Sequence, residues 1–265
     1  MEIKDNWKAD ALIDKKTYNK MYDDSMLDND SFWNKHGQRI VWKNKYTKIK
    51  DVKYSNNDVN IKWYYDGSLN VTESCIDRHA KQNPNKIAII WEGDDPSDTK
   101  KISYSKLLNE VSKTANVLKK IGIKKGDRVT IYLTMIPELA YVMLACARIG
   151  AIHSIIFGGF SSESIAGRIL DCKSDFLITA DEGVRGGKTI PLKAIADKAL
   201  EQCPNIKKCL VVKRTSAKIN LKNNRDEYLN DLIKSVDNIC EPETMNAEDP
   251  LFILYTSGST GKPKG

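Results

Sequence analysis

Residues 128–157 read RVTIYLTMIPELAYVMLACARIGAIHSIIF, and this stretch decides the fold class. It begins with Arg128–Leu133, a run rich in apolar and β-branched side chains that is typical of a buried strand. Pro137 suits the first turn of the helix that follows, and Gly150 can end that helix. A second strand is expected over residues 153–157. A strand, a helix and a strand in this order predict a βαβ unit, in which a helix covers two parallel strands.

The same alternation extends to both sides of this unit. Ser103 can cap a flanking helix that begins at Tyr104 and ends before Gly122. Further strands are expected over 87–91, 175–180, 208–213 and 251–256, with helices over 104–121, 161–172, 191–202 and 228–236. The sequence therefore predicts an α/β fold with a mostly parallel sheet and flanking helices.

Residues 1–70 are set apart by their composition. They are rich in Asn, Asp and Lys, and their apolar residues show little periodicity. Their aromatic residues are too many for a disordered segment, so we expect them to anchor an irregular segment onto a core. A box for an aromatic ligand is the less favoured alternative. These aromatics are Trp33, Trp42, Trp63, Tyr64 and Tyr65. We therefore predict an N-terminal extension over 1–70 and a separate domain over 71–265.

The formal net charge of +7 comes from lysines spread along the sequence. Lysines outnumber arginines by 34 to 8, and no stretch combines dense basic residues with the aromatics of a nucleic-acid platform. A solvated surface is therefore favoured over nucleic-acid binding. The longest apolar run, residues 139–147, is far shorter than a membrane span, and residues 1–10 lack the apolar core of a secretory signal.

The cysteines and histidines indicate neither disulfides nor zinc. The six cysteines include no C-x-x-C pair, and the three histidines lie far apart in the sequence. Cys146 lies within an apolar run and is expected to be a small core residue. We expect a soluble protein of the reducing cytoplasm.

Two glycine-bearing loops follow predicted strands, and ligands of such sheets bind beyond the carboxyl ends of the strands. The first, Phe157-Gly158-Gly159-Phe160, would let a planar group approach the backbone, although a tight turn with core phenylalanines is favoured. The second, residues 183–189, is one residue short of a P-loop. It offers Arg185, Lys188 and glycine N–H groups at a helix start to an anion. The residues alone do not separate this site from a glycine turn with surface cations.

An acidic run, Glu92, Asp94 and Asp95, follows another predicted strand. We interpret it as surface carboxylates in a turn rather than as a metal site or an acid–base pair. No neighbouring Ser, His and Asp, or Cys and His, indicate a catalytic nucleophile.

A third loop lies at the end of the sequence, where residues 255–265 read YTSGSTGKPKG after an apolar run. Its hydroxyls and backbone N–H groups can cradle a polyphosphate. It is not a P-loop, because Gly258 and Gly261 are too close and Pro263 cannot donate an N–H. In an arbitrary sequence such a cluster would be a surface turn. The ordered string, however, resembles the signature loop of the acyl-adenylate-forming enzymes, which activate carboxylic acids with ATP.

The three loops together resemble the N-terminal portion of the AMP-forming acetate–CoA ligases, a family within this superfamily. The resemblance covers nearly the whole chain, including Phe32-Trp33 and Trp63-Tyr64. The terminal loop alone is shared by the whole superfamily. Other sequence segments restrict the resemblance to short-chain acyl-CoA synthetases. Those segments are CIDRH (75–79), IWEGDD (90–95), MLACARIGA (143–151), FGGFS (157–161), DEGVRGGK (181–188) and residues 249–265.

The resemblance implies an incomplete AMP-binding (adenylation) domain over 71–265 and a two-step reaction. Acetate attacks the α-phosphate of ATP to give acetyl-AMP and pyrophosphate, and the CoA thiol then takes the acetyl group and releases AMP. The implied ATP-phosphate site consists of Thr256, Ser257, Gly258, Ser259, Thr260, Gly261 and Lys262. The implied CoA contacts are Phe157, Gly159, Arg185, Gly186, Gly187 and Lys188. Mg²⁺ is expected in the complete enzyme, but no catalytic or metal-binding residue is assigned within this chain.

Two alternatives stay open at this point. A propionate or other short-chain acyl-CoA ligase would share these loops, and so would a non-catalytic nucleotide- or CoA-binding module. Because members of the family continue past the position of Gly265, we expect residues 1–265 alone to be an inactive fragment. The sequence predicts neither the acyl preference nor the oligomeric state.

Overall fold

The computed structural model describes residues 3–256 and 263–265 of the 265-residue chain. The chain divides into two compact units, residues 1–69 with 246–248 and residues 70–245 with 249–265. The short strand β14 (Met245–Asn246) lies where the chain returns to the first unit.

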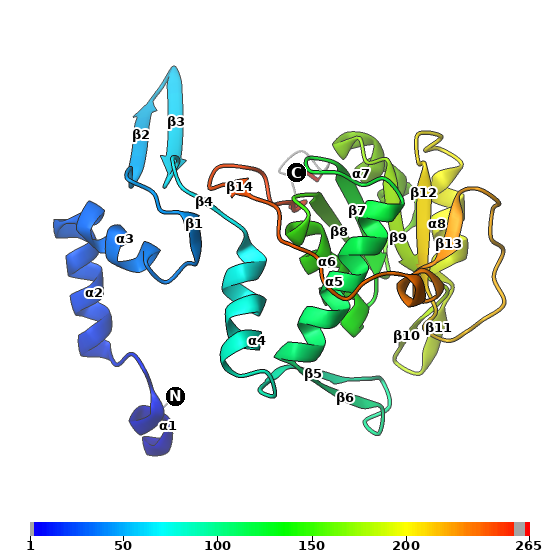
Figure 1. The fold of residues 1–265 in the computed structure, drawn as a ribbon, viewed down its shortest axis with the longest axis horizontal. Helices are drawn as coiled ribbons and strands as arrows, with labels where there is room; N and C mark the ends of the chain where they lie inside the picture. The colour runs from blue at the N-terminus through cyan, green and yellow to red at the C-terminus, as the bar shows by residue number, and fades with distance from the viewer. Residues whose placement is uncertain (1–2, 257–262) are drawn as a thin grey trace. The chain divides into compact units, whose positions relative to one another are not determined.

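The first unit contains short helices and small strand pairs (Figure 1). Its aromatic side chains form a cluster. The ring centroids of Trp33 and Trp63 lie 5.5 Å apart, and those of Trp42 and Tyr64 lie 5.6 Å apart. These aromatics therefore pack on one another within the unit. The elements are α1 (Asp5–Asp10), α2 (Lys15–Leu27), α3 (Asn29–Gly37), β1 (Trp42–Asn44), β2 (Lys50–Ser55), β3 (Asp58–Trp63) and β4 (Ser68–Leu69).

The second unit is built around a six-stranded sheet in the order β13-β12-β9-β7-β8-β15. Its described strand pairs are all parallel. The predicted α/β fold with a mostly parallel sheet is therefore confirmed, and only β13 was not predicted as a strand. The strands are β7 (Arg128–Leu133), β8 (Ile152–Phe157), β9 (Phe176–Ala180), β12 (Lys208–Val212), β13 (Asp226–Tyr228) and β15 (Phe252–Ile253).

Helices cover both faces of this sheet (Figure 1). The connection from β7 through α6 (Pro137–Arg148) to β8 runs one way along the sheet, and that from β8 through α7 (Ser162–Cys172) to β9 runs the other way. Because such crossovers are right-handed, α6 and α7 lie on opposite faces. The helix α5 (Tyr104–Lys120) packs with α6, and α8 (Leu192–Leu200) packs with α7. The strand order thus reverses at β7, and the carboxyl ends of β7 and β9 form a switch point of the kind where ligands bind.

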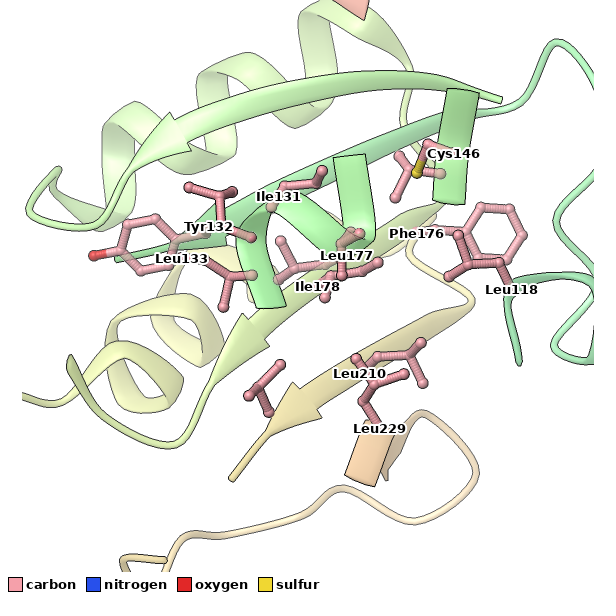
Figure 2. Packing of buried hydrophobic residues seen from close by; sticks show 14 of the residues in the cluster. Leu118, Ile131, Tyr132, Leu133, Cys146, Phe176, Leu177, Ile178, Leu210 and Leu229 are labelled. Atoms are coloured by element: carbon pink, nitrogen blue, oxygen red, sulfur yellow. The ribbon is translucent and has the colours of Figure 1, made fainter. Parts of the chain in front are cut away.

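Figure 2 shows the core, in which the central strands meet the covering helices. Ile131 and Tyr132 from β7, and Leu177 and Ile178 from β9, are fully buried. Burying one such aliphatic side chain stabilises the fold by roughly 1.5–3 kcal/mol. Cys146 on α6 is also fully buried, as expected, and burial raises the pKa of its thiol to about 12, so the thiol stays protonated.

The ends of the helices follow from local sequence. Ser103 caps α5 by accepting from Lys106 N at 3.3 Å. Gly150 follows α6 with a φ angle of +72°, and a Cβ at this position would lie 2.7 Å from Met245 Sδ. Gly150 is therefore required both by the left-handed backbone and by the close packing of Met245.

One predicted strand pairs differently from the expectation. The strand β5 (Ile87–Glu92) forms a separate antiparallel hairpin with β6 (Thr99–Ser103), so the segment 87–91 is not part of the parallel alternation. The turn between the two strands is closed by Gly93 N, which donates to Asp98 O at 2.8 Å. Such a short turn permits only antiparallel pairing, because a parallel crossover needs a dozen or more residues.

The predicted helix over 228–236 is also shorter than expected. It consists of α9 (Leu229–Leu232) followed by a 3₁₀ turn over Ile233–Ser235. Ser235 Oγ donates to Leu232 O at 3.0 Å. This local hydrogen bond competes with continuation of the α-helix, so the segment tightens and ends there. The π-helical turn Glu73–Asp77 and α4 (Arg78–Gln82) complete the described helices of the second unit.

His153 on β8 makes the stability of the second unit dependent on pH. The residue is only 6% exposed, it stacks on Phe252 at a centroid distance of 5.7 Å, and burial lowers its pKa to about 4. The unfolded chain, with a histidine pKa near 6.5, therefore binds a proton that the folded chain excludes, and stability falls as pH drops from 6.5 toward 4. Between pH 7 and pH 5 we expect a loss of about 2 kcal/mol in the free energy of urea unfolding.

The variant His153→Gln should remove most of this pH dependence, whatever its effect on stability at pH 7. The matched control is His79→Gln, which removes a histidine that is only partly buried. If the free energy of unfolding changed equally with pH in the two variants between pH 7 and pH 5, the role of His153 would be contradicted.

Candidate functional site

Loops after β7, β8 and β9 meet at one edge of the sheet, because these strands are parallel neighbours. This is the switch point at which the strand order reverses. A pocket of ≈ 310 Å³ lies there. It is lined by Trp91, Glu92, Gly93, Asp94, Thr134, Met135, Ile136, Phe157, Gly158, Val184, Arg185 and Arg214. The sheet topology therefore places a concave site where the sequence placed the glycine-bearing loops.

The glycine stretch after β9 forms a β-hairpin. The strand β10 (Gly183–Arg185) pairs antiparallel with β11 (Lys188–Ile190), and Gly186 and Gly187 form the turn between them. Their φ angles of +58° and +70° suit a type I′ turn, which glycine adopts without strain. Helix α8 begins only at Leu192, so the expectation of glycine N–H groups at a helix start is wrong.

Arg185 extends from this hairpin over the first glycine loop. The carbon of its guanidinium lies 5.1 Å from the centroid of the Phe157 ring, a cation–π contact. A Cβ at Gly159 would lie 3.1 Å from the same ring and 3.6 Å from Arg185 Nη1, so the absence of a side chain keeps this surface open. Phe157 is 49% exposed, and the expectation of core phenylalanines in this loop is therefore wrong. Lys188 is exposed on the neighbouring strand of the hairpin.

A second arginine reaches the pocket from the segment after β12. Arg214 lies over the Trp91 ring at 5.1 Å and donates to Asp98 Oδ2 at 3.1 Å. Trp91 Nε1 donates to Met135 O at 2.7 Å, which fixes the indole in the pocket wall. Neither Arg214 nor Met135 was predicted from the sequence to belong to a site. Arg214 directly follows the predicted strand 208–213, so the rule that ligands bind at carboxyl ends could have identified it.

Arg185 offers the pocket a cation for an anionic ligand with a planar group, although the carboxylates of Glu92 and Asp94 also line it. Within the described part of the chain, no carboxylate lies within ion-pair distance of Arg185 or Lys188, whereas Arg214 is paired with Asp98. An arginine beside an aromatic ring can bind a phosphate while the ring stacks on a base. The arrangement can therefore hold a nucleotide, with its phosphate near Arg185.

The start and the end of the terminal loop are joined. Thr256 N donates to Lys264 O at 3.0 Å, and Lys264 N donates to Thr256 O at 3.1 Å. Tyr255 OH donates to Asp171 Oδ2 at 2.6 Å, and the Arg168 guanidinium lies 5.3 Å from the Tyr255 ring. Burial, together with the bond to Asp171, raises the pKa of Tyr255. Of the expected phosphate-binding residues, Ser257, Gly258, Ser259, Thr260, Gly261 and Lys262 lie outside the described residues.

Among residues 3–256 and 263–265, no group of three or more His, Cys, Asp or Glu side chains could hold a metal ion. None of their helices is both long enough and apolar enough to span a membrane.

Comparison with known proteins identifies the family. Residues 76–265 match the family described as AMP-binding enzyme, and residues 18–75 match the family described as acetyl-coenzyme A synthetase N-terminus. The chain is 57% identical over 259 residues to the acetyl-coenzyme A synthetase of Parvibaculum lavamentivorans and 58% identical over 262 residues to that of Brucella suis. These alignments cover 98% and 97% of this chain but 40% of each relative.

A solved structure shares the fold. The acetoacetyl-CoA synthetase of Streptomyces lividans superposes with a TM-score of 0.83, covering 97% of this chain and 39% of that protein at 21% sequence identity. The chain thus spans about 40% of the length of the curated relatives that it matches. The resemblance inferred from the loops is confirmed: the chain belongs to the AMP-binding enzyme family and carries the N-terminal segment of acetyl-coenzyme A synthetases.

Proposed function

We propose that this chain is the N-terminal part of an acetate–CoA ligase, which forms acetyl-CoA, AMP and pyrophosphate from acetate, ATP and CoA. The observation that carries the proposal is the meeting of Phe157 and Arg185 at a pocket on the carboxyl edge of the sheet. Strand β8, which ends at Phe157, is paired with β15, and β15 leads into the loop that begins at Thr256. One sheet edge therefore carries both a candidate CoA site and a candidate ATP site.

In the first step, a carboxylate oxygen of acetate attacks the α-phosphorus of ATP, and the bond from that phosphorus to the bridging oxygen of pyrophosphate breaks. We assign the β- and γ-phosphates to the loop Thr256, Ser257, Gly258, Ser259, Thr260, Gly261 and Lys262. Its hydroxyls, N–H groups and lysine would stabilise the negative charge that grows on the leaving pyrophosphate. The hydrogen bonds between Thr256 and Lys264 support this assignment, because they bring the two ends of the loop together.

In the second step, the CoA sulfur attacks the acetyl carbon of acetyl-AMP, and AMP leaves. We assign the nucleotide end of CoA to Phe157, Gly159, Arg185, Gly186, Gly187 and Lys188. The open surface at Gly159 beside the Phe157 ring suits the adenine. Arg185, which has no ion-pair partner among the described residues, suits a phosphate. The N–H groups of Gly186 and Gly187 already donate to Asp94, so these residues would contribute by forming the turn rather than by donating to CoA.

Mg²⁺ would accompany ATP, but no described residues form a group that could hold a metal, so no ligand to it is assigned. We assign the N-terminal extension to the first unit, which ends at residue 69 apart from residues 246–248. The change from one family match to the other between residues 75 and 76 supports a boundary near this position. A cytoplasmic location also belongs to the proposal, since all six cysteines are free thiols.

The test of this function uses the full-length protein that carries this segment. Acetate-dependent exchange of pyrophosphate into ATP reports the first step, and thioester formation with CoA reports the second. We expect both activities with acetate, and a comparison with propionate establishes the acyl preference. Nucleotide binding without exchange for any short-chain acid would overturn the proposal in favour of a non-catalytic binding module.

The CoA assignment predicts a selective loss in the double variant Arg185→Gln/Lys188→Gln. Each charge-assisted hydrogen bond contributes ~1.5–3 kcal/mol before solvent screening, and both side chains are exposed, so we expect the KM for CoA to rise about tenfold. The KM for ATP should stay nearly unchanged. The matched control Lys124→Gln/Lys207→Gln removes the same charge from residues that precede β7 and β12, at the opposite edge of the sheet. An effect mainly on ATP would instead assign the hairpin to the ATP phosphates.

A further inference from the structure

The turn of the β10–β11 hairpin is bound by a carboxylate from a different hairpin. Gly186 N donates to Asp94 Oδ1 at 3.1 Å, and Gly187 N donates to Asp94 Oδ2 at 2.6 Å. Each oxygen of the carboxylate therefore accepts one hydrogen bond. Asp94 lies in the turn between β5 and β6, which is ninety-odd positions earlier in the chain.

Without this contact the hairpin would be poorly supported at its turn. It is a two-stranded sheet of its own, and isolated hairpins are marginally stable in water. Its base is held tightly, since a Cβ at Gly183 would lie 2.5 Å from Thr134 Cγ2. Its turn is exposed, and among the described residues the two bonds to Asp94 are the hydrogen bonds that tie it to another segment. Arg185 directly precedes this turn.

The segment that carries Asp94 is itself well ordered by hydrogen bonds. Gly93 N donates to Asp98 O at 2.8 Å, and Asp98 N donates to Asp95 O at 2.9 Å. Asp98 in turn accepts from Arg214, which lies over Trp91 in the pocket wall. Asp94 thus links an ordered turn by hydrogen bonds to the hairpin that bears Arg185.

We propose that Asp94 is a positioning residue for the pocket: by binding the N–H groups of Gly186 and Gly187, it holds Arg185 over Phe157 in the orientation that receives a phosphate of the nucleotide. The proposal rests on the CoA site described under the proposed function and adds a residue that does not itself touch the ligand's phosphate. Within the acidic run at 92–95, whose carboxylates are exposed as expected, the proposal gives Asp94 alone an additional role.

Electrostatic repulsion alone would make Asp94 weaken the binding of CoA rather than support it. Asp94 lines the same pocket as Arg185, so its negative charge would repel the phosphates of CoA. If the Asp94 carboxylate only repelled the phosphates of CoA, or occupied the N–H groups that a phosphate would otherwise bind, neutralising it would lower the KM for CoA. If it positions Arg185, neutralising it raises that KM. The sign of the change therefore decides between the two roles.

The experiment compares Asp94→Asn with Asp95→Asn in the full-length protein. Asp94 uses both carboxylate oxygens, so an amide in its place loses one acceptor and presents an N–H₂ group to a donor. Asp95 uses only Oδ1, which accepts from Ser97 N at 2.9 Å and from Ser97 Oγ at 2.8 Å, so asparagine can keep both bonds there. The two variants remove the same charge from adjacent residues, but only one of them loses the support of the turn.

We expect Asp94→Asn to raise the KM for CoA about tenfold through the displaced guanidinium, with kcat and pyrophosphate exchange unchanged. Asp95→Asn should change the KM for CoA by less than about twofold. Asp94→Glu, which keeps the carboxylate, should recover part of the loss. A KM for CoA that falls or stays constant in Asp94→Asn would overturn the proposal.

A second readout does not depend on catalysis. Amide hydrogen exchange of residues 183–190, followed by mass spectrometry, should become faster in Asp94→Asn and stay unchanged in Asp95→Asn. Unchanged exchange in both variants would overturn the role of Asp94 even if the CoA site is correct. Conversely, faster exchange in Asp94→Asn together with a normal KM for CoA in Arg185→Gln/Lys188→Gln would overturn the CoA site and leave the support of the turn intact.

Discussion

Replacing Arg148 by methionine is expected to lower the free energy of unfolding by about 3–5 kcal/mol. Arg148 lies at the end of α6 with a side chain that is 5% exposed. It donates to Asp77 through two parallel bonds, Nη1 to Oδ2 at 2.8 Å and Nη2 to Oδ1 at 2.9 Å, and also to Thr72 Oγ1 at 3.1 Å and to Cys240 O. Methionine fills much of the volume but leaves the Asp77 carboxylate without its partner.

The measurement is urea unfolding of the full-length protein, followed by a signal from the second unit. The matched control is Lys125→Met, which removes an exposed cation that lies 3.3 Å from Asp249 and should cost less than about 1 kcal/mol. The double variant Arg148→Met/Asp77→Leu should recover part of the loss, because it removes the unpartnered charge as well. A loss as small in Arg148→Met as in the control would show that the ion pair adds little.

Replacing Gly258 by valine in the full-length protein is expected to lower acetate-dependent pyrophosphate exchange by about 10²–10³-fold. The prediction follows from the proposed phosphate role of the terminal loop, since Gly258 lies outside the described residues. A side chain at this position would hinder the approach of the backbone donors to the phosphates. Transfer of the acetyl group from supplied acetyl-AMP to CoA should be much less affected, because pyrophosphate has already left.

The control for this variant is Gly167→Val on α7. A Cβ at Gly167 meets no neighbouring atom within 4 Å, so valine fits there without displacing the helix. Both reactions should proceed normally in the control. If Gly258→Val kept exchange and lost only the transfer to CoA, the loop would have to be reassigned to the second step.

The sheet could be predicted from sequence because its strands are defined by local composition. Arg128–Leu133 and the run around Cys146 are apolar enough that burial is the only stable outcome, and the structure buries both. Whether a strand pairs parallel or antiparallel was harder to predict from the sequence. Ile87–Glu92 has the same kind of composition, yet Ile90 is 71% exposed and the strand pairs back on β6. Its short turn, rather than its apolar residues, decides that outcome.

Site residues could be predicted where the sequence of a single loop marks them, but contacts between different loops could not. Arg185 and Phe157 could be named from their glycine-rich loops. Their contact, however, depends on the order of the sheet, in which β8 and β9 lie on opposite sides of β7. The role of Asp94 could not be predicted, since nothing near it in sequence marks Gly186 and Gly187 as its donors. Arg214 could have been identified from its position after the strand 208–213, but its placement over Trp91 depends on tertiary packing.

The strand order has a consequence for how the chain assembles during synthesis. The strands β7, β8 and β9 form the interior of the sheet and leave the ribosome early, whereas β13 and β15, the last two strands of this sheet along the chain, occupy its two edges. The sheet can therefore grow outward in the order of translation, and β15 joins β8 only after a long intervening segment has folded.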